Sequence, residues 1–220
     1  MGPGLVGLLG PNGAGKSTLM GLLSTLSELQ SGTIHVGDAD LSDAEKVRRH
    51  VGYLPQSFTV PALERVHAVV EYAAWARGVD SAQCAQVAAE AMAATGIEER
   101  ARERVRSLSG GYRQRLGIAC AIVGDPSLVL LDEPTVGIDP VQRVQIRQLL
   151  GQVAERATVL LATHLLEDLD LPDARVVVIN EGQALFQGSI TELSLLGAGV
   201  VEPGQRPLEA GYVTALRGQS

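Results

Sequence analysis

One stretch near the start of the chain combines glycines, a lysine and hydroxyl groups at a spacing suited to phosphate. It reads Gly10-Pro11-Asn12-Gly13-Ala14-Gly15-Lys16-Ser17-Thr18, after an apolar run and before leucines at helical spacing. Glycines let the backbone turn tightly and aim N–H groups at an anion, and the helix N-terminus adds unpaired amides. Lys16 can reach β- and γ-phosphates, and the Ser17 hydroxyl can ligate Mg²⁺. These residues predict a nucleoside-triphosphate site; the alternative is a chance glycine-rich turn.

Two carboxylates follow a second apolar run, Ser127-Leu128-Val129-Leu130-Leu131-Asp132-Glu133. A continuous apolar run is typical of a strand covered on both faces of a parallel sheet, and ligands bind at the carboxyl ends of such strands. Asp132 is suited to hold Mg²⁺ through water, and Glu133 to orient or deprotonate an attacking water. The alternative is a pair of surface acids that end a strand.

Other polar residues stand where predicted elements begin or end. Ser109-Gly110-Gly111 opens a helix and forms a second helix N-terminus suited to an anion, although such a sequence alone is an ordinary N-cap. Gln56 ends a predicted strand at 51–56, and His164 ends another at 158–164. Asp139 is the expected N-cap of a helix that begins with a proline.

The elements that must position these residues predict an α/β protein. Residues 61–107 are helical in pattern and lack strand signals, so we expect a helical insertion into a parallel-sheet core. Capping boxes are expected at 42–45, 80–83 and 189–192. Two strands around a turn are predicted over 176–186, and a short helix over 208–216. On the first helix of the insertion, Tyr72 and Trp75 are interpreted as packing residues, with a docking surface as the alternative.

Composition narrows the class of protein. The chain has 220 residues and a net charge of -7, without a dense basic cluster, so nucleic acid is not expected as a partner. Cys84 and Cys120 form no metal or redox motif, and the absence of a secretory signal favours the cytosol. The longest apolar runs fall short of the roughly 20 residues that span a bilayer.

With Lys16-Ser17, Leu108-Ser109-Gly110-Gly111 and Asp132-Glu133 in that order, the chain resembles the ATP-binding subunit (nucleotide-binding domain) of an ABC transporter. The resemblance extends from Gly4 to about Glu192. It implies a P-loop NTPase core with a helical subdomain, in which Gln56 matches the Q-loop, Asp139 the D-loop and His164 the switch histidine. The implied division is a P-loop core at 1–60, a helical subdomain at 61–107, a second core section at 108–196 and a C-terminal tail at 197–220.

The resemblance also implies an ATPase that acts as a head-to-tail dimer with a second ATP-binding subunit, most simply a second copy of the chain. Each ATP and Mg²⁺ would lie between the loop at 10–18 of one chain and Ser109-Gly110-Gly111 of the other. Glu133 would activate water, His164 would contact the γ-phosphate, and Ser17, Gln56 and Asp132 would serve the Mg²⁺. A separate integral membrane permease would hold the subunit on the cytoplasmic face of the membrane. The sequences of the loop and of residues 134–140 look most like those of drug or antibiotic exporters.

Two alternatives and two departures accompany this interpretation. The alternatives are a soluble ABC-type ATPase not coupled to transport, and a truncated ATP-binding module with impaired hydrolysis. Tyr112 stands where the commonest signature has Gln. Family members usually have two antiparallel strands before the loop, with an aromatic residue that stacks on adenine. This chain is expected to lack both strands, which would leave an open edge at residues 33–36.

Overall fold

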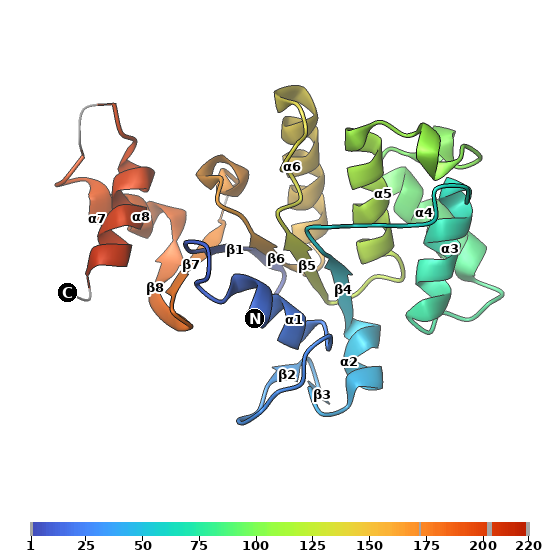
Figure 1. The fold of residues 1–220 in the computed structure, drawn as a ribbon, viewed down its shortest axis with the longest axis horizontal. Helices are drawn as coiled ribbons and strands as arrows, with labels where there is room; N and C mark the ends of the chain where they lie inside the picture. The colour runs from blue at the N-terminus through green and yellow to red at the C-terminus, as the bar shows by residue number, and fades with distance from the viewer. Residues whose placement is uncertain (1, 172, 202–203, 219–220) are drawn as a thin grey trace.

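A six-stranded sheet organises the computed structural model, which describes residues 2–171, 173–201 and 204–218. The strand order is β4-β5-β6-β1-β7-β8 (Figure 1). The strands are β1 (Gly4–Leu9), β4 (Val51–Leu54), β5 (Leu128–Asp132), β6 (Thr158–Ala162), β7 (Arg175–Asn180) and β8 (Gln183–Ser189). Strands β4, β5, β6, β1 and β7 pair in parallel in that order, and β8 pairs antiparallel with β7. The predicted α/β class with a parallel core is confirmed.

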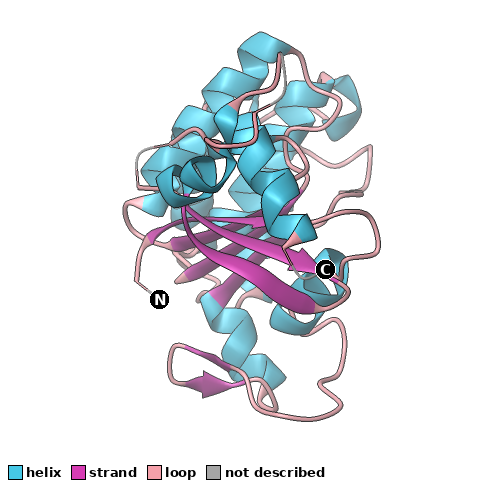
Figure 2. Ribbon diagram, turned by 90° about the vertical axis from the view of Figure 1, so that its left-hand side faces the viewer, coloured by secondary structure: helices cyan, strands magenta, loops and turns pink. Residues whose placement is uncertain are grey.

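Helices cover both faces of this sheet, as Figure 2 shows. One face carries α1 (Lys16–Leu23) and α2 (Ala44–His50), and the other carries α5 (Gly110–Ile122) and α6 (Pro140–Ala154). Strand β5 packs on both faces. Leu130 lies in the core beneath α1 and α2, and Val129 and Leu131 lie in the core beneath α5 and α6. A strand buried on both faces needs apolar residues at every position.

Residues 61–107 are helical, as predicted. They form α3 (Val66–Ala76), α4 (Cys84–Ala94) and the short 3-10 helices η1 (Glu98–Arg100) and η2 (Val105–Ser107). These elements lie beyond the β4 edge of the sheet together with α5 (Figure 1). Val66, Val69, Val70 and Ala74 form the predicted buried stripe of α3.

The interpretation of Tyr72 and Trp75 as packing residues is wrong. Their exposed fractions are 66% and 57%, and their ring centroids lie 5.7 Å apart, so the two rings contact each other in solvent. The physical reason is helical geometry, because at about 100° per residue Trp75 lies roughly opposite Val66 on α3. The two rings therefore form an apolar surface on the outside of this helix.

The segment expected to have an open edge forms a small separate hairpin. Strand β2 (His35–Val36) pairs antiparallel with β3 (Ala39–Asp40), and within the described chain these two strands form a sheet of their own. Val36 and Ala39 are buried in the same core as α1 and α2. The hairpin is therefore anchored by its side chains rather than by the main sheet.

Two of the three expected capping boxes differ from prediction. Asp43, not Ser42, is the N-cap of α2, because Asp40 accepts hydrogen bonds from both the backbone N–H and the hydroxyl of Ser42. The helix expected from Asp80 starts only at Cys84, since Asp80 accepts a hydrogen bond from Ala82 in a turn.

The third box, at the start of α7 (Ile190–Gly197), is confirmed. The Ser189 hydroxyl accepts a hydrogen bond from the Glu192 N–H, and the Glu192 carboxylate accepts one from the Ser189 N–H. The predicted C-terminal helix is also confirmed as α8 (Pro207–Arg217), while positions 202, 203, 219 and 220 of the predicted tail lie outside the described residues. Both helices pack at the β8 end of the sheet (Figure 1). Among all helices of the described ranges, none combines the length and apolarity needed to cross a membrane.

Candidate active site

Part of the predicted site converges because four parallel strands end at the same edge of the sheet. The register aligns Leu54 with Leu131, Asp132 with Ala162, and Ala162 with Leu8. The segments that follow β1, β4, β5 and β6 carry the glycine loop, Gln56, Glu133 and His164. In an open parallel sheet, ligands bind at this edge.

The glycine loop between β1 and α1 is held by its own backbone geometry and by a neighbouring turn. Gly13 and Gly15 have φ values of 82° and 102°, which favour glycine, and Gly15 is the N-cap of α1. A Cβ on Gly10 would lie 2.4 Å from the Ile179 carbonyl oxygen. The N–H of Gly182, in the β7–β8 turn, donates to the Ala14 carbonyl at 3.0 Å. The antiparallel hairpin therefore fixes the loop from outside.

Lys16, the first residue of α1, spans the loop from within. Its Nζ donates to the Gly10 carbonyl at 2.6 Å and to the Pro11 carbonyl at 3.1 Å. A pocket of about 220 Å³ opens beside it. The lining residues are Asn12, Gly13, Ala14, Gly15, Lys16, Ser17, Thr18, Gln56, Asp132 and Glu133. The structure thus brings the loop, Gln56 and both carboxylates into one cavity.

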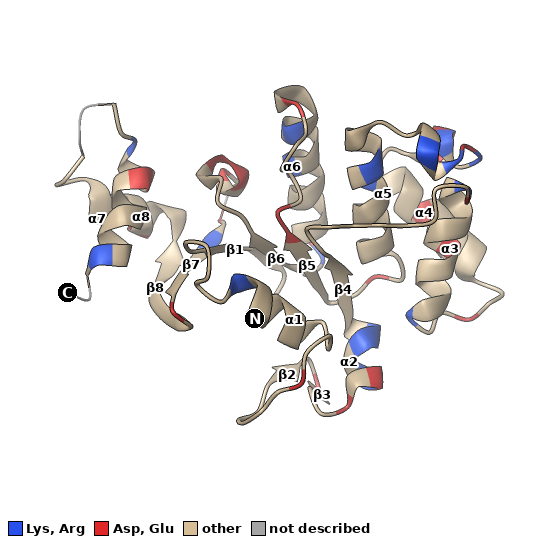
Figure 3. Cartoon of the chain, in the orientation of Figure 1, with Lys and Arg blue, Asp and Glu red and all other residues tan. Residues whose placement is uncertain are grey.

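The electrostatics of this pocket pair a basic helix start with an acidic strand end. Figure 3 shows blue at the start of α1 and red at the end of β5. Burial and the neighbouring Glu133 raise the pKa of Asp132, while the charge of Lys16 and a hydrogen bond from Ser17 act in the opposite direction. Asp132 is only 6% exposed. An anion held at high energy by burial is poised to gain from a bound cation.

Glu133 is held in an uncommon backbone conformation. Its φ is 52°, in the left-handed region that non-glycine residues rarely adopt, and its N–H donates to the Ala162 carbonyl at 2.9 Å. His164 Nδ1 lies 2.9 Å from the Glu133 carboxylate. The Glu133 side chain is 10% exposed and that of His164 is 60% exposed. His164 does not line the pocket itself but contacts the acid that does.

Sequence reasoning missed a buried polar cluster directly behind this pair. Asp168 lies on η3 (Leu166–Leu169) and accepts hydrogen bonds from the hydroxyls of Thr135 and Thr163. All three residues are fully buried. The available signal was the position of the two threonines, one just after Glu133 and one just before His164.

The predicted second phosphate-seeking helix end lies apart from the pocket. Ser109 is the N-cap of α5 and accepts from the Tyr112 N–H at 3.5 Å, but neither Ser109, Gly110 nor Gly111 lines the cavity. The Tyr112 ring lies under the Arg100 guanidinium, 4.1 Å from the ring centroid. This contact ties the first turn of α5 to η1, and it gives the unusual Tyr112 a structural role.

Asp139 is not among the residues that line the pocket, and the helix that it caps contacts Gly111 through Gln142. It is the N-cap of α6 and accepts from the Gln142 N–H at 3.0 Å. The Gln142 amide packs directly on Gly111, where an added Cβ would lie 1.3 Å from Gln142 Oε1. The predicted residues therefore form two separate groups on one chain.

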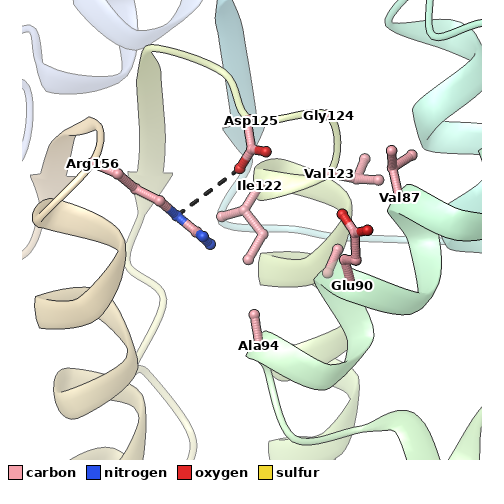
Figure 4. A pocket seen from close by; sticks show the side chains of 9 residues that line it. Val87, Glu90, Ala94, Ile122, Val123, Gly124, Asp125 and Arg156 are labelled. Carbon is pink, nitrogen blue, oxygen red and sulfur yellow. Dashed lines mark ion pairs between the residues drawn. The ribbon is translucent and has the colours of Figure 1, made fainter.

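A further hollow lies between α4, the end of α5 and the end of α6 (Figure 4). Its volume is about 70 Å³, against about 220 Å³ for the pocket beside the glycine loop. Glu90 and Asp125 line it, with Arg156 4.0 Å from Asp125. Two carboxylates and one cation do not suit a triphosphate.

The pocket beside the glycine loop does fit a nucleoside triphosphate with a divalent cation. Ser17, Gln56 and Asp132 offer a hydroxyl, an amide and a carboxylate, which are the oxygen ligands that Mg²⁺ takes. The backbone N–H groups of the loop and the ammonium of Lys16 suit phosphate oxygens. None of the residues that line this cavity in the described ranges is aromatic, and Phe58 packs against the core instead.

Comparison with known proteins gives a family match over residues 3–136, to the model described as ABC transporter. The chain is 33% identical over 198 residues to the linearmycin resistance ATP-binding protein LnrL of Bacillus subtilis, covering 89% of this chain and 64% of that protein. It is 37% identical over 206 residues to the Nod factor export ATP-binding protein I of Cupriavidus metallidurans, covering 89% and 66%. It is 34% identical over 203 residues to the methionine import ATP-binding protein MetN of Xanthomonas oryzae pv. oryzae, covering 89% and 61%. The chain therefore spans less than two thirds of the length of these relatives.

Solved structures share the fold. One, described as the ATP-binding subunit of an ABC transporter, has a TM-score of 0.79 at 27% identity and covers 97% of this chain and 88% of its own. Another, described as a dimeric ATP-binding cassette in a post-hydrolysis state with ADP and Pi, has a TM-score of 0.74 at 24% identity, covering 84% and 85%.

Proposed function

The chain belongs to the ABC transporter family, and from that premise we propose that it is an ATP-hydrolysing subunit that powers transport. One observation carries the proposal: the glycine loop, Asp132 and the Glu133–His164 contact meet at one edge of the sheet. A site that only bound phosphate would not need a carboxylate held by a histidine beside the loop.

The proposed chemistry divides among these residues. The loop N–H groups and Lys16 bind the phosphates of ATP, and Ser17, Gln56 and Asp132 would hold Mg²⁺, which neutralises phosphate charge when bound. Glu133 accepts a proton from the attacking water as its oxygen bonds to the γ-phosphorus and the bond to ADP breaks. His164 orients the Glu133 carboxylate and offers its exposed side to the γ-phosphate.

The active form we propose is a head-to-tail dimer, most simply of two copies. Ser109-Gly110-Gly111 and Asp139 lie outside the pocket of their own chain. A helix N-terminus that seeks an anion has a natural ligand in the γ-phosphate held by a second chain. The dimeric arrangement described for one solved cassette is consistent with this proposal.

The proposed partner is a separate membrane permease, which would hold the protein at the cytoplasmic face of the membrane. The exposed rings of Tyr72 and Trp75 on α3 support a docking surface there, since aromatic residues are enriched at protein interfaces. In this proposal, residues 61–107 form the permease-facing subdomain between the core sections 1–60 and 108–196, with a tail from 197. Export is the proposed direction, from the resemblance of residues 10–18 and 134–140 to exporter subunits, while relatives named for resistance, export and import match at similar identities of 33%, 37% and 34%.

The test of this function uses hydrolysis and association together. We expect the purified protein to hydrolyse ATP with Mg²⁺, and Glu133→Gln to bind ATP without hydrolysing it and to dimerise. Dimerisation is measured by size-exclusion chromatography with light scattering. As a matched control, Lys16→Ala added to Glu133→Gln should prevent the ATP-dependent dimer. A Glu133→Gln protein that stays monomeric at saturating ATP and Mg²⁺ would contradict the shared site.

A further inference from the structure

We propose that Asp168 is a positioning residue that fixes the backbone segments of Glu133 and His164 relative to each other. The inference rests on the proposed ATPase function, and it concerns a residue outside every sequence motif discussed above. The geometry behind it is a single buried carboxylate oxygen shared by two hydroxyl donors from two different loops.

Two hydroxyl groups meet at one oxygen of Asp168. Asp168 Oδ2 accepts from Thr163 Oγ1 at 3.0 Å and from Thr135 Oγ1 over a shorter distance. Each of the three residues has an exposed fraction of 0%. The second oxygen, Oδ1, is buried and has no hydrogen-bond partner in the described part of the chain.

The two threonines lie close to Glu133 and His164 in the chain. Thr135 comes two residues after Glu133, and Thr163 comes immediately before His164. Thr163 Oγ1 also accepts from the Leu165 N–H at 3.0 Å, so the same hydroxyl orders the backbone on both sides of His164. The Asp168 cluster therefore lies behind the 2.9 Å contact between His164 and Glu133 and joins the two loops that carry it.

The backbone of Glu133 needs such a support. Glu133 has a φ of 52°, and such a backbone conformation persists only where the surroundings enforce it. A buried carboxylate with one unpartnered oxygen is a costly way to fill space, since an apolar side chain of similar volume would avoid that cost. Its expected benefit is directional: one oxygen can hold two hydroxyls at fixed angles, and a leucine cannot.

The element that carries Asp168 is itself anchored. Arg147 on α6 donates to the Glu167 carbonyl at 2.5 Å, and Arg206 lies 3.3 Å from the Glu167 carboxylate. The η3 turn is therefore held from α6 and from the start of α8 while Asp168 reaches inward. This gives the cluster a fixed base from which to position the two loops.

The test compares variants that keep or remove the shared oxygen. We expect Asp168→Leu and Thr135→Val to lower kcat for ATP hydrolysis at least about 10-fold while KM for ATP changes less than about threefold. The conservative variants Asp168→Asn and Thr135→Ser, which retain an oxygen or a hydroxyl, should restore kcat to within about threefold of wild type. Circular dichroism and melting temperature are measured for each variant.

A second readout does not depend on turnover. In protein labelled with ¹³C-histidine, the His164 imidazole signal, assigned with His164→Gln, should shift in Asp168→Leu and Thr135→Val. It should return towards the wild-type position in Asp168→Asn and Thr135→Ser. The signals of the other three histidines should not move.

The outcomes separate the two proposals. Wild-type kcat together with an unshifted His164 signal in Asp168→Leu overturns the positioning role, as does a parallel loss in kcat and ATP affinity. If Asp168→Leu does not fold, the Thr135→Val and Thr135→Ser pair decides. If the wild-type protein hydrolyses no ATP, the proposed function fails, and the His164 signal alone then tests the positioning role.

Discussion

His164 Nδ1 lies 2.9 Å from the Glu133 carboxylate, and this contact joins the ends of two neighbouring strands of the sheet. The carboxylate is nearly buried whereas the imidazole is mostly exposed, so the pair has one protected side and one open side. A bound γ-phosphate would approach from the open side.

We therefore expect His164→Gln to lower kcat for ATP hydrolysis by on the order of 100-fold, because Glu133, the proposed acceptor of the water proton, loses its orienting partner. A steady-state phosphate-release assay measures the loss. The chain offers a matched control in His67, whose Nδ1 lies 3.0 Å from Glu71 on α3. His67→Gln should leave hydrolysis unchanged, and an equal loss in both variants would contradict the assignment.

Much of the sheet and its ligand edge could be predicted, because parallel strands covered on both faces read as apolar runs. The apolar runs before Asp132 and His164 predict strands β5 and β6 for this reason. The parallel register of these strands then brings their carboxyl ends together. The stripe of α3 was also predictable from period alone. Two predictions failed for reasons that the local pattern does not contain. The Ser42 hydroxyl bonds to the Asp40 carboxylate instead of capping α2, and Tyr72 lies on the exposed face of α3.

The Asp168 cluster could not be predicted for a different reason. Its hydrogen bond to Thr135 joins residues 33 positions apart, and no local pattern marks it. An acidic residue in a turn rich in Glu and Asp reads as solvated. Asp168 is buried because the segment between β6 and β7 packs it against the hydroxyls of Thr135 and Thr163.

The raised pKa of Asp132 predicts a conflict between stability and metal binding. A carboxyl group whose folded pKa is raised stabilises the fold when protonated, below its unfolded pKa, and that contribution is lost as pH rises through the folded pKa. At pH 7 the ionised Asp132 should therefore cost stability in the nucleotide-free protein.

We expect Asp132→Asn to raise the melting temperature without nucleotide at pH 7 and to lack the further rise that we expect of the wild type with ATP and Mg²⁺. A gain of about 1 kcal/mol would shift a chain of this size by about 2–4 °C. The gain should shrink as the pH is lowered towards 4. The exposed Asp125 provides the control, and Asp125→Asn should change neither melting temperature nor ATP response.

Gly111 and Gly110 allow a test of the contact between α5 and α6. A Cβ on Gly111 would lie 1.3 Å from Gln142 Oε1, whereas a Cβ on Gly110 would meet nothing within 4 Å. Both glycines lie in the first turn of α5, where alanine is favoured over glycine by up to about 1 kcal/mol, so the cost of the contact is measured against Gly110→Ala. Because Gln142 is flexible, its side chain can move away, and we expect Gly111→Ala to be less stable than Gly110→Ala by only about 1 kcal/mol of unfolding free energy. Gly110→Ala should cost nothing.

Adding Gln142→Ala to Gly111→Ala should remove that cost, as measured by urea denaturation of the four proteins of a double-mutant cycle. Additive costs in the cycle would mean that the two residues do not contact each other in solution. ATP-dependent dimerisation of the same variants, in the Glu133→Gln background, reports whether the contact also matters to the proposed shared site.

The C-terminal helices provide the strictest packing test, because their backbones meet at glycines. A Cβ on Gly211 of α8 would lie 1.8 Å from the Leu193 carbonyl oxygen of α7, a backbone atom that cannot rotate away. Alanine is about 1 kcal/mol better than glycine inside a helix, so the clash must exceed this gain before Gly211→Ala destabilises the fold. Overpacking of this kind costs about 1–3 kcal/mol, and separating two backbones belongs at the upper end of that range.

We therefore expect Gly211→Ala to show a net loss of unfolding free energy in urea, together with faster amide hydrogen exchange across α7 and α8. Gly199→Ala, whose Cβ meets nothing within 4 Å, should match wild type, and equal stability of the two variants would show that α7 and α8 do not pack this closely.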